Sequence, residues 1–295
     1  MGKIIRKVTP KVVAAPRAAV IAQREMSQVL GSRRNFYRPM IRSRHPSHAP
    51  LREVMERLPF RSVIRMGSTT ELEDVFTANG TRVELNSADA IRNSSSKIKM
   101  KECFTEANVN TASWIRASTP EAIIEGMSQF SESGEISYPI VAKHAYGSRG
   151  TGNTLLKSEL EIREWCVGKN LESHVFEKFY NFNKEYRLHV TKNGCFYACR
   201  KMLKSEFKDH PNAWQRHDDN CVWILQENEN FDKPSNWDQI VEHCVKALVS
   251  CGLDFGACDL RVQNSHTSEG IIRENCEFIV VEINSAPSFG DVTLE

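Results

Sequence analysis

The sequence contains no apolar run of the length that spans a membrane, which takes about 20 predominantly apolar residues. Residues 1–23 are mildly apolar, but Lys11, Pro16 and Arg17 interrupt them, so we expect no secretory signal peptide. The chain begins Met-Gly, yet Arg6 stands where an N-myristoylation signal needs Ser or Thr. These absences favour a soluble protein without a membrane partner.

Cysteine pairs of the C-x-x-C type are also missing. The nine cysteines are scattered, and the two closest are Cys195 and Cys199. An odd, dispersed set is typical of reduced thiols and indicates neither a disulfide framework nor a zinc site. We therefore expect a cytoplasmic location.

Two familiar nucleotide-binding motifs are absent as well. The sequence has neither the dinucleotide fingerprint G-x-G-x-x-G nor the P-loop G-x-x-x-x-G-K-[ST], so it supports neither of those folds. What is present is an ordinary globular composition, with 40% hydrophobic and 26% charged residues in 295. That length fits one large domain or two moderate ones.

Charge is distributed unevenly along the chain. Residues 1–65 hold fifteen Lys or Arg and three Glu, a net charge of +12, whereas residues 66–295 carry a net charge of −10. Either the basic arm docks on nucleic acid or another polyanion, or it is a solubilising tail or folds back on the acidic body. Charge alone does not choose between these.

Proline and periodicity divide the chain further. Residues 1–50 contain five prolines and are predicted to be a flexible arm. Beyond them, strands and helices alternate, and the expected fold class is α+β. The predicted strands cover 62–68, 81–86, 111–118, 138–145, 154–158, 173–181, 184–202 as a hairpin around Asn193-Gly194, 254–263 and 276–284. The predicted helices cover 87–108, 119–133, 158–170 and 236–252, the last with Ile240, Val241, Cys244, Val245, Leu248 and Val249 facing inward.

A glycine-rich loop follows one of the apolar strands. Lys143 ends this strand, and Gly147, Gly150 and Gly152 follow it. Glycines let backbone N–H groups approach anionic oxygens closely, and Lys143 with Arg149 adds charges suited to phosphate. The alternative is an ordinary glycine-rich turn.

Acidic residues accompany the next strands. Glu177 ends an apolar strand, and Glu185 and Arg187 share one face of the hairpin that follows. Such strands can bind a ligand through backbone groups and accept ribose hydroxyls on a carboxylate. The alternative is that Glu185 and Arg187 only pair in solvent, which contributes little.

Oxygen donors lie on the two C-terminal strands. Glu282 and Asn284 share a face because strand side chains alternate, and Asp259 ends the preceding strand. Three oxygen donors that converge from two antiparallel strands suit Mg²⁺, and Arg261 on the same face could hold an anion. The alternative is a strand end with a solvated Glu and a turn-forming Asn.

These elements occur in a particular order: a lysine ahead of the domain, a lysine with a glycine loop, an acidic hinge, an Asp, and then Glu-x-Asn. In this order the chain resembles the ATP-grasp enzymes, and most of all the RimK-type carboxylate–amine ligases, over about residues 85–295. The resemblance implies an ATP-grasp fold, in which two α/β subdomains with antiparallel sheets grip ATP. It divides the chain into the arm 1–50, a reduced pre-grasp region 51–115, a lysine and glycine-loop subdomain 116–180 and a metal-binding subdomain 181–295.

The resemblance also implies roles for individual residues. Those implied to contact ATP are Lys97, Lys143, Gly147, Ser148, Arg149, Gly150, Gly152, Glu177, Lys178, Phe179 and Glu185. Glu177 and the backbone of Lys178 and Phe179 would read adenine, and Glu185 would bind ribose. Asp259, Glu282 and Asn284 would hold Mg²⁺, or Mn²⁺ in its place. The catalytic residues would be Lys143, Arg187 and Arg200, the two arginines facing phosphate or acyl phosphate.

The reaction implied by the resemblance is an ADP-forming ligation of a carboxylate to an amine through an acyl phosphate. A peptide or protein tail is among the candidate substrates, and neither their identity nor the oligomeric state follows from the sequence. Two other functions stay open: a kinase-like phosphotransferase, and a nucleic-acid-associated binding protein with a non-catalytic ATP-grasp body.

Overall fold

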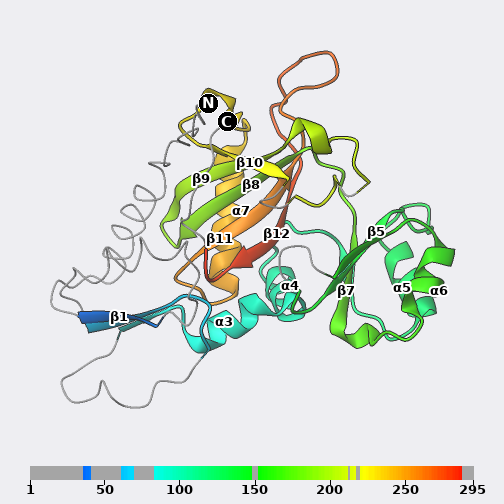
Figure 1. Ribbon diagram of the computed structural model, residues 1–295, viewed down its shortest axis with the longest axis horizontal. Helices are drawn as coiled ribbons and strands as arrows, with labels where there is room; N and C mark the ends of the chain where they lie inside the picture. The colour runs from blue at the N-terminus through cyan, green and yellow to red at the C-terminus, as the bar shows by residue number, and fades with distance from the viewer. Residues whose placement is uncertain are drawn as a thin grey trace, which may run out of the picture.

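The computed structural model describes residues 36–40, 61–69, 83–147, 152–211, 213–216 and 220–287 (Figure 1). Most of the predicted arm lies outside these residues, and so do Ser148, Arg149 and Gly150 of the glycine loop. Residues 36–40 lie within the range predicted to be an arm and form a strand.

A small parallel sheet precedes the two larger sheets. It has the order β1 (Phe36–Met40), β2 (Arg61–Arg65), β3 (Val83–Leu85), and both strand pairs are parallel. Asn86, just after β3, donates its side-chain amide to the Phe255 carbonyl at 3.0 Å and accepts from the Asp254 N–H at 2.9 Å. These bonds fix the end of the small sheet to the start of the strand that carries Asp259.

The second sheet is antiparallel and has four strands in the order β4, β7, β5, β6. They are β4 (Trp114–Ile115), β5 (Ile140–His144), β6 (Asn153–Leu156) and β7 (His174–Lys178). Helices α5 (Pro120–Ser128) and α6 (Glu159–Cys166) pack against it around Ile123, Ile140, Ile162 and Phe176. Thr119 caps α5 by accepting the Ala122 N–H.

The third sheet is antiparallel with five strands in the order β10, β9, β8, β11, β12. They are β8 (Lys184–Thr191), β9 (Gly194–Leu203), β10 (Cys221–Leu225), β11 (Phe255–Val262) and β12 (Phe278–Asn284). The hairpin predicted around Asn193-Gly194 is confirmed, although only Gly194 takes a positive φ there, at 124°. Short 3₁₀ helices are η3 (Leu171–Ser173), η4 (Ser205–Phe207) and η5 (Glu229–Phe231).

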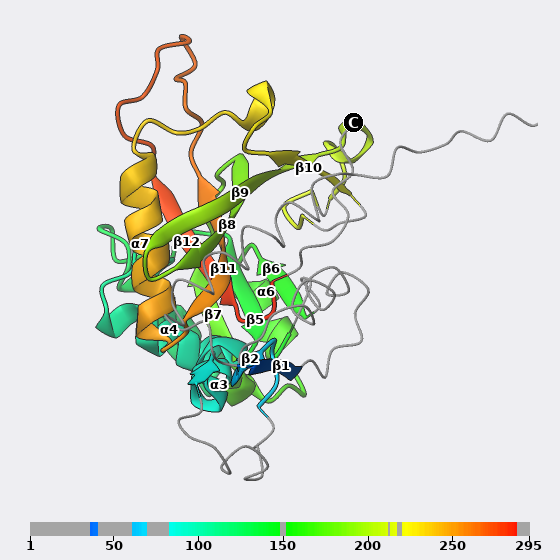
Figure 2. The ribbon, with the colours of Figure 1, turned by 90° about the vertical axis from the view of Figure 1, so that its left-hand side faces the viewer.

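Helix α7 (Trp237–Ser250) covers one face of the five-stranded sheet (Figures 1 and 2). Ile240, Cys244 and Leu248 are buried there, as predicted. The prediction for Val249 was wrong, because its side chain is 57% exposed and Ala247 is buried instead. The spacing of three and four residues from Cys244 brings Ala247 and Leu248 inward and turns Val249 to solvent.

The helix predicted for 87–108 is two helices. Helix α3 (Ala88–Ser95) ends where Ser96 takes an extended conformation, and the Ser96 hydroxyl then caps α4 (Lys97–Glu106). Both helices pack into the core of the five-stranded sheet, α4 through Met100 and Phe104. Helix α4 also contacts β7, so it lies between the two larger sheets (Figure 1).

All nine cysteines are free thiols. Within the part of the chain that the structure describes, no helix has the length and apolar character to cross a membrane.

Candidate active site

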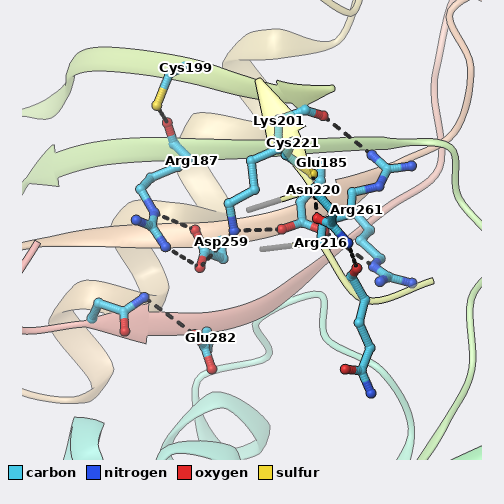
Figure 3. A network of polar contacts seen from close by, with 12 residues as sticks. Glu185, Arg187, Cys199, Lys201, Arg216, Asn220, Cys221, Asp259, Arg261 and Glu282 are labelled. Atoms are coloured by element: carbon cyan, nitrogen blue, oxygen red, sulfur yellow. Dashed lines mark hydrogen bonds and ion pairs between the residues drawn. The ribbon is translucent and has the colours of Figure 1, made fainter. Parts of the chain in front are cut away.

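The face of the five-stranded sheet opposite α7 is charged (Figure 3). Strand alternation sends Tyr186, Leu188 and Val190 of β8 into the core beneath α7 and leaves Glu185 and Arg187 on the other face. Asp259 of β11 lies opposite Arg187 in the register of the two strands. Glu185 likewise has cations from both neighbouring strands opposite it, Arg261 of β11 and Lys201 of β9.

Asp259 is ion-paired on this face. Arg187 donates to both of its carboxylate oxygens, each at 2.7 Å. Lys201 Nζ lies 4.0 Å from the same carboxylate and 2.8 Å from Glu185. Burial alone would raise the pKa of Asp259, but Arg187 and Lys201 outweigh it and lower the pKa to about 2. The carboxylate is therefore ionised at neutral pH. The sequence predicted that Asp259 ends its strand. That prediction was wrong: Asp259 lies in the middle of β11, because β11 continues to pair with β12 as far as Val262.

The three predicted metal ligands lie on neighbouring positions of β11 and β12. Asp259 is opposite Glu282, and a bulge after Asp259 takes Val281 out of register. Asn284 follows on the same face, with its amide 3.5 Å from a Glu282 oxygen. The set consists of two carboxylates and one amide. Among the described residues, no three His, Cys, Asp or Glu side chains lie close enough together to hold a metal ion. The donors of the set are all hard oxygens, which fits a divalent cation such as Mg²⁺.

Lys97 connects Glu282 to the start of the glycine loop. Its Nζ donates to the Gly147 carbonyl at 2.6 Å and lies 3.5 Å from a Glu282 oxygen. Its backbone N–H donates to the Ala145 carbonyl at 2.8 Å. At the other end of the loop, Gly152 has a φ of 80°, which favours glycine. The structure thus brings together Lys97, the start of the glycine loop and the acidic end of β12.

Lys143 and Glu177 form a second cluster, in which a third residue takes part. Lys143 Nζ lies 2.7 Å from one oxygen of Glu177, and Lys101 Nζ lies 3.4 Å from the other. Burial would raise the pKa of Glu177, but the two lysines outweigh it and lower the pKa. Lys101 was not among the residues predicted from the sequence. Its only signal was a spacing of four residues from Lys97, which places both on one face of α4.

The hinge after Glu177 is held by the protein itself. The N–H groups of Lys178 and Phe179 donate to the carbonyls of Ser113 and Pro139, at 2.9 and 3.4 Å. A ligand in contact with these residues would therefore meet their carbonyl oxygens. The guanidinium of Arg261 lies over the Phe179 ring, 5.6 Å from its centre, and donates to the Tyr180 carbonyl at 3.4 Å.

The structure does not bring Arg200 to this face. Arg200 pairs with Tyr186 across β8 and β9, so its side chain is on the α7 side, where it donates to the Asn230 carbonyl at 3.0 Å. The adjacent Lys201 occupies the charged face instead, because neighbouring strand residues point in opposite directions. Trp223 of β10 covers this group, with its ring centre 5.0 Å from both the Arg187 guanidinium and Lys201 Nζ.

Lys101→Met should change the dependence of stability on pH above about 8. Burial, opposed by Glu177, lowers the Lys101 pKa from 10.5 to about 8, so between these values the unfolded chain binds more protons than the folded one. The contribution of Lys101 to stability therefore rises with pH across this window. Urea unfolding should show the difference in free energy of unfolding, wild type minus variant, rising by up to about 3 kcal/mol. Lys99→Met, at an exposed position on the same helix, should show no such rise. A constant difference for Lys101→Met would contradict the lowered pKa.

The arrangement defines a class of fold. One antiparallel sheet carries the lysine strand and the glycine loop, helix α4 contacts both larger sheets, and the second antiparallel sheet has acidic and basic residues on its open face. No protein-family model and no curated protein sequence matches the chain.

Solved structures identify the fold as ATP-grasp. Carboxyaminoimidazole ribonucleotide synthase from Aspergillus clavatus, complexed with ATP, aligns with a TM-score of 0.53 and 16% identity over 94% of this chain and 68% of its own. N5-carboxyaminoimidazole synthetase from Staphylococcus aureus, complexed with ADP, also aligns with a TM-score of 0.53 and 16% identity, over 84% and 59%. The predicted ATP-grasp fold is thereby confirmed.

The comparisons do not decide the branch within that fold. A RimK-domain ATP-grasp protein from Sphaerobacter thermophilus aligns with a TM-score of only 0.43 and 14% identity, over 77% of this chain and 74% of its own. The chain spans 54% of the ATP-grasp ligase PsnB, which aligns at a TM-score of 0.45 and 16% identity over 70% of this chain. The RimK-type placement stays a prediction.

Proposed function

We propose that this protein is an ATP-dependent ligase that joins a carboxylate to an amine and releases ADP and phosphate. The observation that carries the proposal is the meeting of Lys97 with the glycine loop and Glu282, beside Asn284 and Asp259. Cations and oxygen donors on opposite elements are what a metal–triphosphate complex requires. The fold supports the same ligand, since the two similar structures were solved with ADP and ATP.

Individual residues have separate roles in nucleotide binding. Lys97 and Lys143 supply positive charge for the phosphates, and Glu185 supplies a carboxylate for the ribose hydroxyls. The carbonyl oxygens of Lys178 and Phe179 would face the adenine edge, whereas both oxygens of the Glu177 carboxylate are held by Lys143 and Lys101. Asp259, Glu282 and Asn284 would hold Mg²⁺, which neutralises charge on the phosphate oxygens when it is bound.

The reaction has two steps. A carboxylate oxygen of the substrate attacks the γ-phosphorus of ATP, and the bond to ADP breaks, which gives an acyl phosphate. The amine nitrogen then attacks the acyl carbon, loses a proton, and phosphate leaves. Transfer of this kind needs positioning and charge neutralisation more than covalent help, and Arg187 with Lys143 and Lys97 provides the cations.

No cysteine acts as a nucleophile in this proposal. Cys199 lies opposite Arg187 in the register of β8 and β9, and its Sγ donates to the Arg187 carbonyl at 3.8 Å. Burial raises the pKa of Cys199 to about 12, so the thiol stays protonated at neutral pH. The chemistry is therefore left to substrate groups and to the cations around them.

Product analysis tests the reaction class. With ATP and Mg²⁺, ADP release should depend on an added carboxylate and an added amine, and a screen of both classes would find the pair. Mass spectrometry should then detect the amide product. A stable phosphorylated substrate formed without any amine would support a phosphotransferase and contradict the ligase.

Glu282→Ala should remove most of the rise in melting temperature that ATP with Mg²⁺ gives to the wild type. Glu282 faces Asp259 and touches Lys97, so its loss takes away both a metal donor and the partner of a phosphate-binding lysine. Thermal unfolding with and without ATP and Mg²⁺ measures the effect. Glu277→Ala is the matched control, because Glu277 is exposed just ahead of the same strand. A full shift in Glu282→Ala would remove the metal assignment.

A further inference from the structure

Glu177 is buried between two lysines that come from different elements. Its side chain is 4% exposed, and each carboxylate oxygen has its own lysine, Lys143 of β5 and Lys101 of α4. The proposed function requires Lys143 to contact nucleotide phosphates. A lysine that does so has to give up some or all of its contact with Glu177.

The two lysines differ in how firmly they are held. Lys101 is 1% exposed, and its Nζ donates to the Thr111 hydroxyl at 2.6 Å. That hydroxyl donates in turn to the Val280 carbonyl of β12 at 2.8 Å. The Lys143 side chain is 12% exposed, and within the part of the chain that the structure describes its only polar partner is Glu177. Lys101 is therefore fixed, whereas Lys143 can turn toward the glycine loop that follows its strand.

We propose that Lys101 is a positioning residue, the permanent counter-ion of Glu177 that allows Lys143 to leave the carboxylate and bind nucleotide phosphates. The inference rests on the proposed ATP binding. Removing one partner of a buried ion pair leaves an uncompensated charge, which is strongly unfavourable. With Lys101 in place, Glu177 keeps a cation while Lys143 moves. Without Lys101, phosphate binding would have to pull away the last cation from a buried carboxylate.

A double-mutant cycle of Lys101 and Glu177, measured by ADP binding, tests the role of Lys101 as the counter-ion of Glu177. Calorimetric titration of ADP at about pH 7, where Lys101 is largely charged, should show at least a tenfold weaker affinity for Lys101→Met than for the wild type. In a Glu177→Gln background no buried carboxylate needs a counter-ion, so adding Lys101→Met should change the affinity less than about threefold. Lys99→Met, exposed on the same helix, is the matched control and should bind like the wild type.

The cycle separates positioning from support of the fold. If Lys101 only supported the packing of α4, its removal would weaken ADP binding equally in both backgrounds, and that result would overturn the inference. Unchanged affinity in Lys101→Met would overturn it too, while the proposed function would stand. Failure of the wild type to bind either ATP or ADP would overturn both. Should Lys101→Met not fold, Lys101→Gln, which keeps a donor for Thr111, gives the same comparison.

Discussion

Asp259→Asn should lower ligase turnover by at least about a thousandfold. The substitution keeps the shape of the side chain and removes its charge, so the proposed metal site loses one of its two carboxylates. Arg187 loses the carboxylate that accepts from its Nε and Nη2, and Glu185 becomes the one carboxylate paired with Lys201 among the described residues. Removal of a single electrostatic contact to a transition state already reduces turnover by about 10²–10³, and here two such contacts change together.

The same substitution should also reduce stability. Breaking a buried ion pair by removal of one partner costs about 3–5 kcal/mol, because the remaining charge stays buried. Turnover must therefore be measured on protein that circular dichroism shows to be folded, with urea unfolding run in parallel. Asp232→Asn is the control: Asp232 pairs with Lys184 and Arg200 away from the charged face and should keep turnover within about threefold. Equal losses in both variants would show that stability alone sets the result.

The part of the site that the sequence predicted depends on local pattern. Glu282 and Asn284 share a face by the period of a strand, and the hairpin turn at Gly194 follows from its backbone freedom. The sequence also predicted that Asp259 and Glu282 lie together, because they are on the two C-terminal strands, which were expected to be adjacent and antiparallel. Each of these features is decided within a few residues or between consecutive strands.

The part that the sequence did not predict depends on packing between distant segments. Lys101 lies in a helix with two other lysines, and only the tertiary contact with Glu177 and Thr111 distinguishes it. The break between α3 and α4 follows a serine whose hydroxyl caps the second helix, and a continuous helix fitted the apolar pattern equally well. Arg200 and Lys201 were both basic and adjacent, and only the register of β8 and β9 decides which of them faces the site.

Arg187→Met and Arg200→Met should therefore behave very differently. Arg187 lies on the charged face, bound to Asp259 and stacked over Trp223, so its removal should lower turnover by about a hundredfold or more. Arg200 is on the α7 side with Asn230 and Asp232, so its removal should leave turnover within about threefold and act on stability alone. Steady-state ADP release and urea unfolding, measured on both variants, give the comparison.

The comparison of the two arginines also tests the strand register on which the whole site rests. A shift of one residue between β8 and β9 would turn Arg200 to the charged face in place of Lys201. A large loss of turnover in Arg200→Met would mean that β9 pairs with β8 one residue out of the register described, whereas Arg187 would stay opposite Asp259 on β11. Because Arg187, Asp259 and Glu282 are opposite one another on the adjacent strands β8, β11 and β12, nearly unchanged turnover in Arg187→Met would instead contradict the catalytic role of Arg187. The pair of variants thus checks the geometry of the site and the assignment of its catalytic cation in one experiment.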